Sequence, residues 1–103
     1  MTAAFLKFAE RIAMDIVRKH FHIDGQVQGV GFRYRAVHGA AALGLTGWVR
    51  NLEDGTVEME VQGPDDRITE LLVLINRGMF VRMEDVRERA IPVLPEERGF
   101  SAY

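Results

Sequence analysis

The sequence predicts one α+β domain in which two helices cover one face of a mainly antiparallel sheet. Three observations carry this prediction: the apolar period alternates between strand and helix values, Gly-, Pro- and Asp-containing turns separate the segments, and no segment is apolar for long enough to span a bilayer. The 103 residues, 48% of them hydrophobic and 27% charged, have the size and composition of a single globular domain. We therefore expect one core and no membrane partner.

The first half of the chain has the pattern strand, helix, strand. Residues 18–25 alternate apolar and polar side chains, which is typical of a half-buried strand. Residues 33–43 carry an apolar face at helical spacing, and Gly44 supplies a C-terminal stop. Residues 45–51 form a second strand, and an Asp-Gly pair closes the hairpin loop that follows it.

The second half repeats this alternation in the order strand, helix, strand. The third strand has the clearest pattern, with Val57, Met59 and Val61 predicted to face the core. A helix starts after the Gly63-Pro64 pair and ends near Gly78, and residues 80–91 form a fourth strand whose alternation changes phase near Glu84 and Asp85, which predicts a bulge. Residues 100–103 are predicted to form a short edge strand. The order β-α-β-β-α-β with this extra strand is that of the ferredoxin-like α/β sandwich.

This topology brings two separated segments to one end of the sheet. In a split βαβ unit the first two strands run parallel with the third between them, so their C-terminal ends lie together. The glycine-rich run 25–33 follows the first strand, and Asn51 ends the second. We therefore expect this run and Asn51 to share one pocket.

The run Gly25-Gln26-Val27-Gln28-Gly29-Val30-Gly31-Phe32-Arg33 is typical of an anion site, above all for phosphate. Glycines leave backbone N–H groups uncovered, a helix N-terminus attracts negative charge, and an arginine fork binds two oxygens at once. The candidate phosphate-binding residues are Gln28, Gly29, Val30, Gly31, Phe32 and Arg33. Taken alone, a glycine-rich turn before a helix is more often only a tight connection.

The rest of the sequence restricts the chemistry at such a site. The chain has no cysteine, its one serine is Ser101 near the C-terminal end, and no acidic cluster has a metal-ligand pattern. A phosphatase without a nucleophile or a metal suits an activated substrate such as an acyl phosphate, whose carboxylate leaving group has a pKa of about 4 and needs no general acid. Asn51 would orient the attacking water. We expect no metal and no cofactor.

At these residues the chain resembles the acylphosphatase family. The run 25–33 resembles the family's signature loop, and Gly47-Trp48-Val49-Arg50-Asn51 with Asp54-Gly55-Thr56-Val57-Glu58 resembles its second motif. The likeness covers about residues 18–63 and fades toward residue 103. The resemblance implies a ferredoxin-like sandwich, metal-free hydrolysis of acyl phosphates, inorganic phosphate as product and inhibitor, Arg33 as phosphate ligand and Asn51 as the residue that positions water.

Two other classes of function compete with this interpretation. The first is a non-catalytic module that binds phosphate or carbamoyl phosphate, since acylphosphatase-like domains also occur inside larger carbamoyl-phosphate-using maturation proteins. The second is RNA binding through the sheet, which the net charge of −2, the pI near 5.9 and the lack of an aromatic pair disfavour, so we expect no nucleic-acid partner. His20 and His22 share one strand face, as surface histidines or as part of a metal site that lacks a third ligand.

Residues 1–16 are predicted to form an amphipathic helix that precedes the acylphosphatase-like domain of residues 17–103. Its apolar stripe consists of Phe5, Phe8, Ala9, Ile12, Ala13 and Ile16. Charged residues interrupt this stripe, so it lacks the apolar run of a signal peptide, and we expect a cytoplasmic protein. We expect a monomer with this helix docked on the domain. The alternatives are a dimer contact through the helix and an over-extended start, with Met14 as the initiator.

Overall fold

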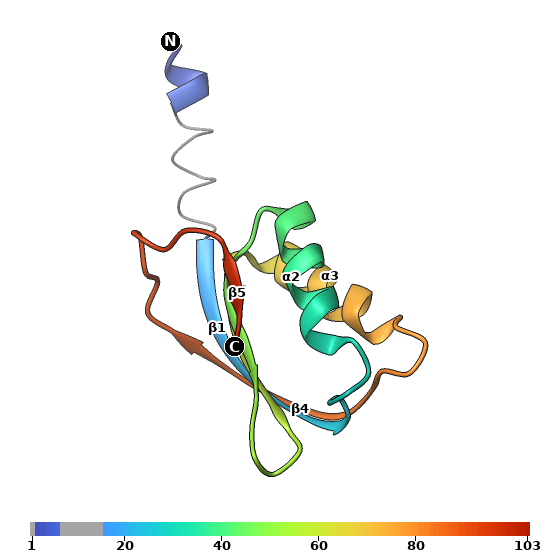
Figure 1. Ribbon diagram of the computed structural model, residues 1–103. Coiled ribbons are helices and arrows are strands. Elements are labelled where there is room, and N and C mark those ends of the chain that lie inside the picture. Colours follow the sequence, from blue (N-terminus) through green and yellow to red (C-terminus); the bar gives the residue numbers. More distant parts are fainter. Residues whose placement is uncertain (1, 7–15) are drawn as a thin grey trace.

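The computed structural model describes residues 2–6 and 16–103, and within them it confirms the predicted sandwich. A five-stranded sheet in the order β4-β1-β3-β2-β5 carries two helices, α2 and α3, on one of its faces (Figure 1). The elements are β1 (Ile16–Gln26), α2 (Phe32–Leu43), β2 (Thr46–Asn51), β3 (Val57–Pro64), α3 (Asp65–Asn76), β4 (Arg82–Ile91) and β5 (Phe100–Ala102). Residues 3–6 are helical. Ile16, predicted as the last helical residue, instead begins β1, where it pairs with Pro64. Residues 7–15 of the predicted helix, including Met14, lie outside the described residues.

Strand pairing gives the parallel arrangement that the site requires. Strands β1 and β2 both pair antiparallel with β3, so they run in the same direction on either side of it. Strand β4 pairs antiparallel with β1, and β5 pairs parallel with β2. The C-terminal ends of β1 and β2 therefore lie at one end of the sheet, as the sequence predicts.

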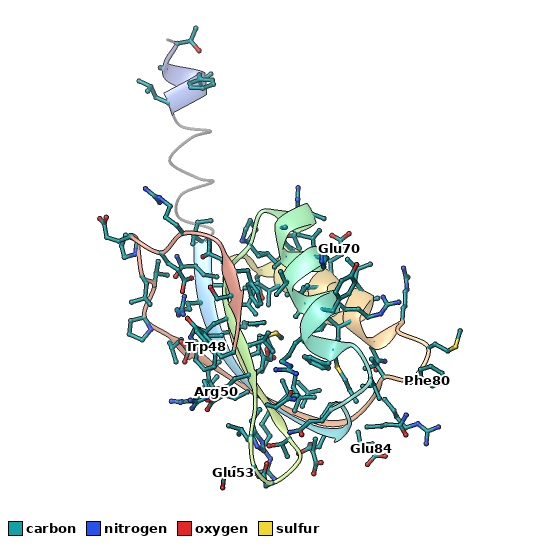
Figure 2. The ribbon with its side chains drawn as sticks, in the orientation of Figure 1. Trp48, Arg50, Glu53, Glu70, Phe80 and Glu84 are labelled. Atoms are coloured by element: carbon teal, nitrogen blue, oxygen red, sulfur yellow. The ribbon has the colours of Figure 1, made fainter. Side chains whose placement is uncertain are left out.

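The phase change in the fourth strand is a bulge. Opposite β1 the register steps from Asp24–Asp85 to Gly25–Met83, which leaves Glu84, labelled in Figure 2, as the extra residue. Gly25 has φ 133°, and a Cβ there would lie 2.2 Å from the carbonyl oxygen of Arg82. Only glycine therefore fits at the point where β1 leaves the sheet and the glycine-rich loop begins.

The core lies between the sheet and the two helices. Val57, Met59 and Val61 are fully buried, as predicted, and pack with Phe21 and Ile23 of β1. The helices contribute Phe32, Ala36, Ala40, Ile68, Leu71 and Ile75 to the same cluster. Burial of these apolar side chains is the main stabilising contribution to the fold, and it fixes α2 against the end of the sheet where the glycine-rich loop lies.

Helix α2 begins and ends at glycines in left-handed conformations. Gly31 precedes it with φ 84° and ψ 14°, and Gly44 follows it with φ 68° and ψ 28°. Helix α3 has Asp65 and Asp66 in its first turn, where carboxylates complement the helix dipole, and it ends at Asn76. Among the described residues, no helix is long and apolar enough to cross a membrane.

Candidate functional site

A small pocket opens at the shared end of β1 and β2, beside the start of α2. Its volume is about 210 Å³, and it is lined by Val27, Gly29, Gly31, Phe32, Arg33, Tyr34, Asn51 and Ala102. Arg33 and Asn51, predicted from separate motifs, thus line the same pocket. Four of the six predicted loop residues line it too, whereas Gln28 and Val30 do not.

The loop before α2 has the backbone of an anion site. Gly29 and Gly31 have φ values of 68° and 84°, in the left-handed region that favours glycine. The first helical hydrogen bond is from the Arg35 amide to the Gly31 carbonyl, at 3.0 Å. Within residues 2–6 and 16–103, the backbone N–H groups of residues 28–33 have no hydrogen-bond acceptor. These free donors coincide with the positive end of the α2 dipole.

The Arg33 side chain is exposed, and among the described residues it makes one hydrogen bond. Its Nη1 donates to the backbone carbonyl of Tyr103 at 3.0 Å, and the remaining guanidinium N–H groups stay available for a ligand. Tyr103 is itself fixed to the sheet, because its amide donates to the Val49 carbonyl at 2.9 Å. The chain segment after β5 therefore orients the arginine.

A buried arginine on the sheet face opposite the helices anchors the loop that leads to β5. Arg18 is only 2% exposed, and its guanidinium contacts Glu97 at 2.7 Å and Glu60 at 3.0 Å. Burial lowers the pKa of Arg18, but the hydrogen bonds to Glu97 and Glu60 outweigh it and the pKa is raised. Gln62 exchanges two hydrogen bonds with the backbone of Leu94, at 2.9 and 2.8 Å. These contacts tie the segment before β5 to β1 and β3.

Asn51 is the last residue of β2 and pairs with Val57 of β3. Its Oδ1 atom is buried and has no hydrogen-bond partner in the described part of the chain. A buried polar atom without a partner costs free energy, so such an atom at a pocket wall points to a ligand or a water. Nothing else in the site offers a comparable unpaired acceptor among the described side chains.

The Gln28 side chain joins the glycine-rich loop to the β2–β3 hairpin. Its Nε2 donates to the carbonyls of Leu52 at 2.7 Å and Thr56 at 2.8 Å. The same hairpin is closed by the Leu52 amide, which donates to the Thr56 carbonyl at 2.9 Å. Gln28 therefore fixes the distance between the loop and Asn51, a function of its side chain that the sequence pattern does not reveal.

The hairpin loop is ordered by a short polar chain. The Thr56 hydroxyl donates to Asp54 at 2.5 Å and the Thr56 amide donates to the same carboxylate at 3.0 Å, and these bonds lower the pKa of Asp54. Because the one hydroxyl proton is used on Asp54, Thr56 accepts from His22 Nε2 at 2.9 Å. His22 is therefore a donor at Nε2.

His20 is also a donor, since its Nε2 lies 3.0 Å from the Glu58 carboxylate. The two histidines share one strand face, as predicted, and each is committed to a hydrogen bond. This face is the one opposite the helices. No group of three or more metal-ligating side chains occurs within the described ranges. These contacts favour the interpretation of both as ordinary surface histidines over a metal site.

Comparison with known proteins gives a consistent result for sequence and structure. Residues 19–102 match the family model described as Acylphosphatase. A curated acylphosphatase from Geobacillus thermodenitrificans is 44% identical over 84 residues, covering 81% of this chain and 89% of that protein. A solved acylphosphatase structure from Coxiella burnetii has a TM-score of 0.78 at 31% identity, over 90% of this chain and 98% of that one.

A longer protein contains a similar domain. The structure of full-length HypF in its phosphate- and nucleotide-bound form matches with a TM-score of 0.72 and 25% identity. The match covers 85% of this chain but 12% of that chain. The same fold thus exists as most of a short protein and as a small part of a large one.

Proposed function

Because this chain belongs to the acylphosphatase family, we propose that it hydrolyses acyl phosphates to a carboxylate and inorganic phosphate, without a metal. The predicted family, fold and enzyme class are confirmed by the curated relatives and the solved structures. The roles of individual residues are our proposal. One observation carries it. Arg33 lines one small pocket with Asn51, whose Oδ1 has no hydrogen-bond partner among the described residues, and the pocket lies beside a loop of uncommitted backbone N–H groups.

The phosphoryl group binds at the glycine-rich loop. Backbone N–H groups across residues 28–33 donate to its oxygens, with Gln28 and Val30 contributing only through the main chain. Arg33 uses the guanidinium N–H groups that Tyr103 leaves free to bind two non-bridging oxygens. In phosphoryl transfer charge spreads over three equatorial oxygens, so these donors stabilise the transition state as well as the bound substrate.

Asn51 positions the attacking water. Its Oδ1 accepts one hydrogen of the water and turns a lone pair of the water oxygen toward phosphorus. The bond from water oxygen to phosphorus forms while the bond from phosphorus to the acyl oxygen breaks, and the acyl oxygen leaves as a carboxylate. A phosphate oxygen takes the proton of the water, so the side chains end the reaction in their starting protonation states.

A phosphate- or carbamoyl-phosphate-binding module without turnover is the second candidate. The match to a small part of HypF, in a phosphate- and nucleotide-bound structure, supports this second hypothesis. Both candidates require the phosphate pocket, but only the enzyme requires a positioned water. The Asn51 acceptor therefore favours the enzyme.

The test is hydrolysis of benzoyl phosphate, followed by ultraviolet absorbance in the presence of EDTA. Wild type should turn over, and Arg33→Ala should lose nearly all activity. Arg33→Lys should fail as well, because an ammonium cannot reproduce the fork. Asn51→Ala should lower kcat about 10²-fold while inhibition by inorganic phosphate changes little. If folded wild type binds phosphate without turnover, the protein is the binding module and not an enzyme. If Arg33→Ala keeps its activity, the proposed phosphate site is wrong.

A further inference from the structure

A second depression adjoins the phosphate pocket and extends along the side of α2. It has a volume of about 450 Å³ and is lined by Gly31, Tyr34, Arg35, His38, Gly39 and Leu74. Gly31 and Tyr34 line both depressions, so the two meet at the first turn of the helix. We call the second depression the α2 groove. A substrate whose phosphate lies in the pocket would extend its other end into this groove.

We propose that the α2 groove holds the acyl part of the substrate, and that it selects acyl groups with a flat body and a second anionic group. This inference rests on the proposed function. The lining residues of α2 recur every three or four positions, so they form one stripe on the helix. At about 1.5 Å per residue, the stripe from Gly31 to His38 is about 10 Å long. That length accommodates an aromatic acyl group, whereas an acetyl group would end at the groove entrance.

The walls of the groove suit a flat apolar body. The rings of Tyr34 and His38 lie 4.2 Å apart between centroids, tilted by 40°, and form one wall. Tyr34 is 69% exposed, so its ring offers an open surface on which another ring can pack. Leu74 of α3 also lines the groove and contributes an apolar surface.

Glycine brings the two helices together at the end of the groove. A Cβ on Gly39 would lie 2.8 Å from the Leu71 side chain. A larger residue there would require the Leu71 side chain to move, so the glycine allows α2 and α3 to pack closely beside the groove.

Arg35 supplies the preference for a second anion. Its Nη1 donates to the Leu74 carbonyl at 3.4 Å, and its side chain lies against Gly78, where a Cβ would approach Nε to 2.7 Å. No carboxylate lines the groove, and none in the described part of the chain forms an ion pair with Arg35. Arg35 thus lines the groove with guanidinium donors that no described carboxylate engages. The Arg35 backbone lies about 6 Å along the helix axis from Gly31. Its side chain can therefore reach a part of the substrate beyond the acyl carbonyl group that reacts.

The experiment compares three substrates of increasing reach: acetyl phosphate, benzoyl phosphate and 4-carboxybenzoyl phosphate, each corrected for its uncatalysed hydrolysis. For wild type we expect kcat/KM to rise in that order. Arg35→Gln should lower the ratio of kcat/KM for 4-carboxybenzoyl to benzoyl phosphate about tenfold, which corresponds to loss of one exposed charge-assisted contact. His38→Ala should lower the ratio of benzoyl to acetyl phosphate several-fold, because a ring contact is lost.

Arg89→Gln is the matched control. It removes the same charge from β4, where Arg89 lies beside a hollow on the sheet face opposite the helices. All substrate ratios should match wild type in this variant.

Each outcome separates this inference from the proposed function. If wild type hydrolyses none of the three substrates, the proposed function is wrong. If it hydrolyses all three with ratios that Arg35→Gln leaves unchanged, the function stands and the α2 groove is not the acyl site. If Arg35→Gln lowers all three in proportion, Arg35 acts on the phosphate site or on the fold, and the acyl-site assignment is overturned.

Discussion

The side chain of Gln28 offers a direct test of how the site is held together. Its Nε2 is the only described side-chain atom that donates to both the Leu52 and Thr56 carbonyls, and so links the glycine-rich loop to the hairpin after Asn51. Replacing Gln28 by alanine removes both hydrogen bonds and leaves the backbone N–H of the loop in place. The loop and the hairpin would then lose this side-chain link.

The expected loss of stability depends on the hydrogen bonds that the two carbonyls retain in the variant. The Thr56 carbonyl still accepts from the Leu52 amide at 2.9 Å, and the Leu52 carbonyl still accepts from the Gly55 amide at 3.2 Å. Neither acceptor becomes orphaned, so each lost bond costs near the lower end of the usual 0.5–1.5 kcal/mol. We expect Gln28→Ala to lower the free energy of unfolding by about 1–2 kcal/mol.

The catalytic rate of Gln28→Ala should fall more than its small loss of stability can explain. Asn51 immediately precedes Leu52, so a looser hairpin lets the Asn51 amide move relative to the loop that holds the phosphate. A shift of about 1 Å in a positioning group costs up to about 10²-fold in rate. We expect kcat for benzoyl phosphate to drop about 10- to 100-fold, with little change in inhibition by inorganic phosphate.

Gln28→Glu is the matched comparison, since glutamate has the same shape and no N–H to donate. At neutral pH its carboxylate would face two carbonyl oxygens, so it should be less stable than Gln28→Ala. Protonation restores one donor, so its deficit relative to wild type should shrink as the pH falls through the pKa of the new carboxyl group. Urea denaturation and steady-state kinetics measure both effects. The reasoning is refuted if both variants keep wild-type stability and kcat.

Much of the fold is predictable from sequence because local patterns determine it. The alternation in β3 comes from one face packing on the core, and Val57, Met59 and Val61 are buried accordingly. The phase change in the fourth strand predicts a bulge, which occurs at Glu84. The C-terminal end of α2 follows from Gly44, whose φ of 68° few other residues adopt.

The site is predictable only as far as topology and motif extend. The parallel directions of β1 and β2 are enough to bring Arg33 and Asn51 into one pocket. The contacts that support the site are not predictable in this way. Arg33 donates to the carbonyl of a residue 70 positions later, and Gln28 donates to carbonyls 24 and 28 positions later. Backbone acceptors carry no residue signature, so no sequence pattern marks them. The domain boundary at residue 17, the monomeric state and the cytoplasmic location stay predictions.

Two further perturbations test the sheet that supports the site. Burial raises the pKa of Glu58, but hydrogen bonds from His20 and Arg50 outweigh this effect, and the pKa is lowered from the usual 4.5. The ionised Glu58 therefore stabilises the fold above pH 4.5, and this contribution is lost as the pH falls through the folded-state pKa. Urea denaturation should therefore show a smaller loss of stability between about pH 6 and pH 3 for Glu58→Gln than for wild type; equal losses would contradict the assignment. Gly47→Ala should cost about 3 kcal/mol or more, because φ is 142° and a Cβ would lie 1.9 Å from the Glu60 carbonyl oxygen. Gly55→Ala, with φ 90° and open space around it, carries only the backbone strain and should cost about 1–2 kcal/mol. The Gly47 amide also donates to the Gly99 carbonyl at 3.1 Å, immediately before β5, so moving β2 also displaces the segment whose Tyr103 carbonyl orients the arginine of the phosphate site. Gly47→Ala should therefore weaken inhibition by inorganic phosphate while Gly55→Ala leaves it unchanged, and equal inhibition in the two variants would show that β5 does not orient that arginine.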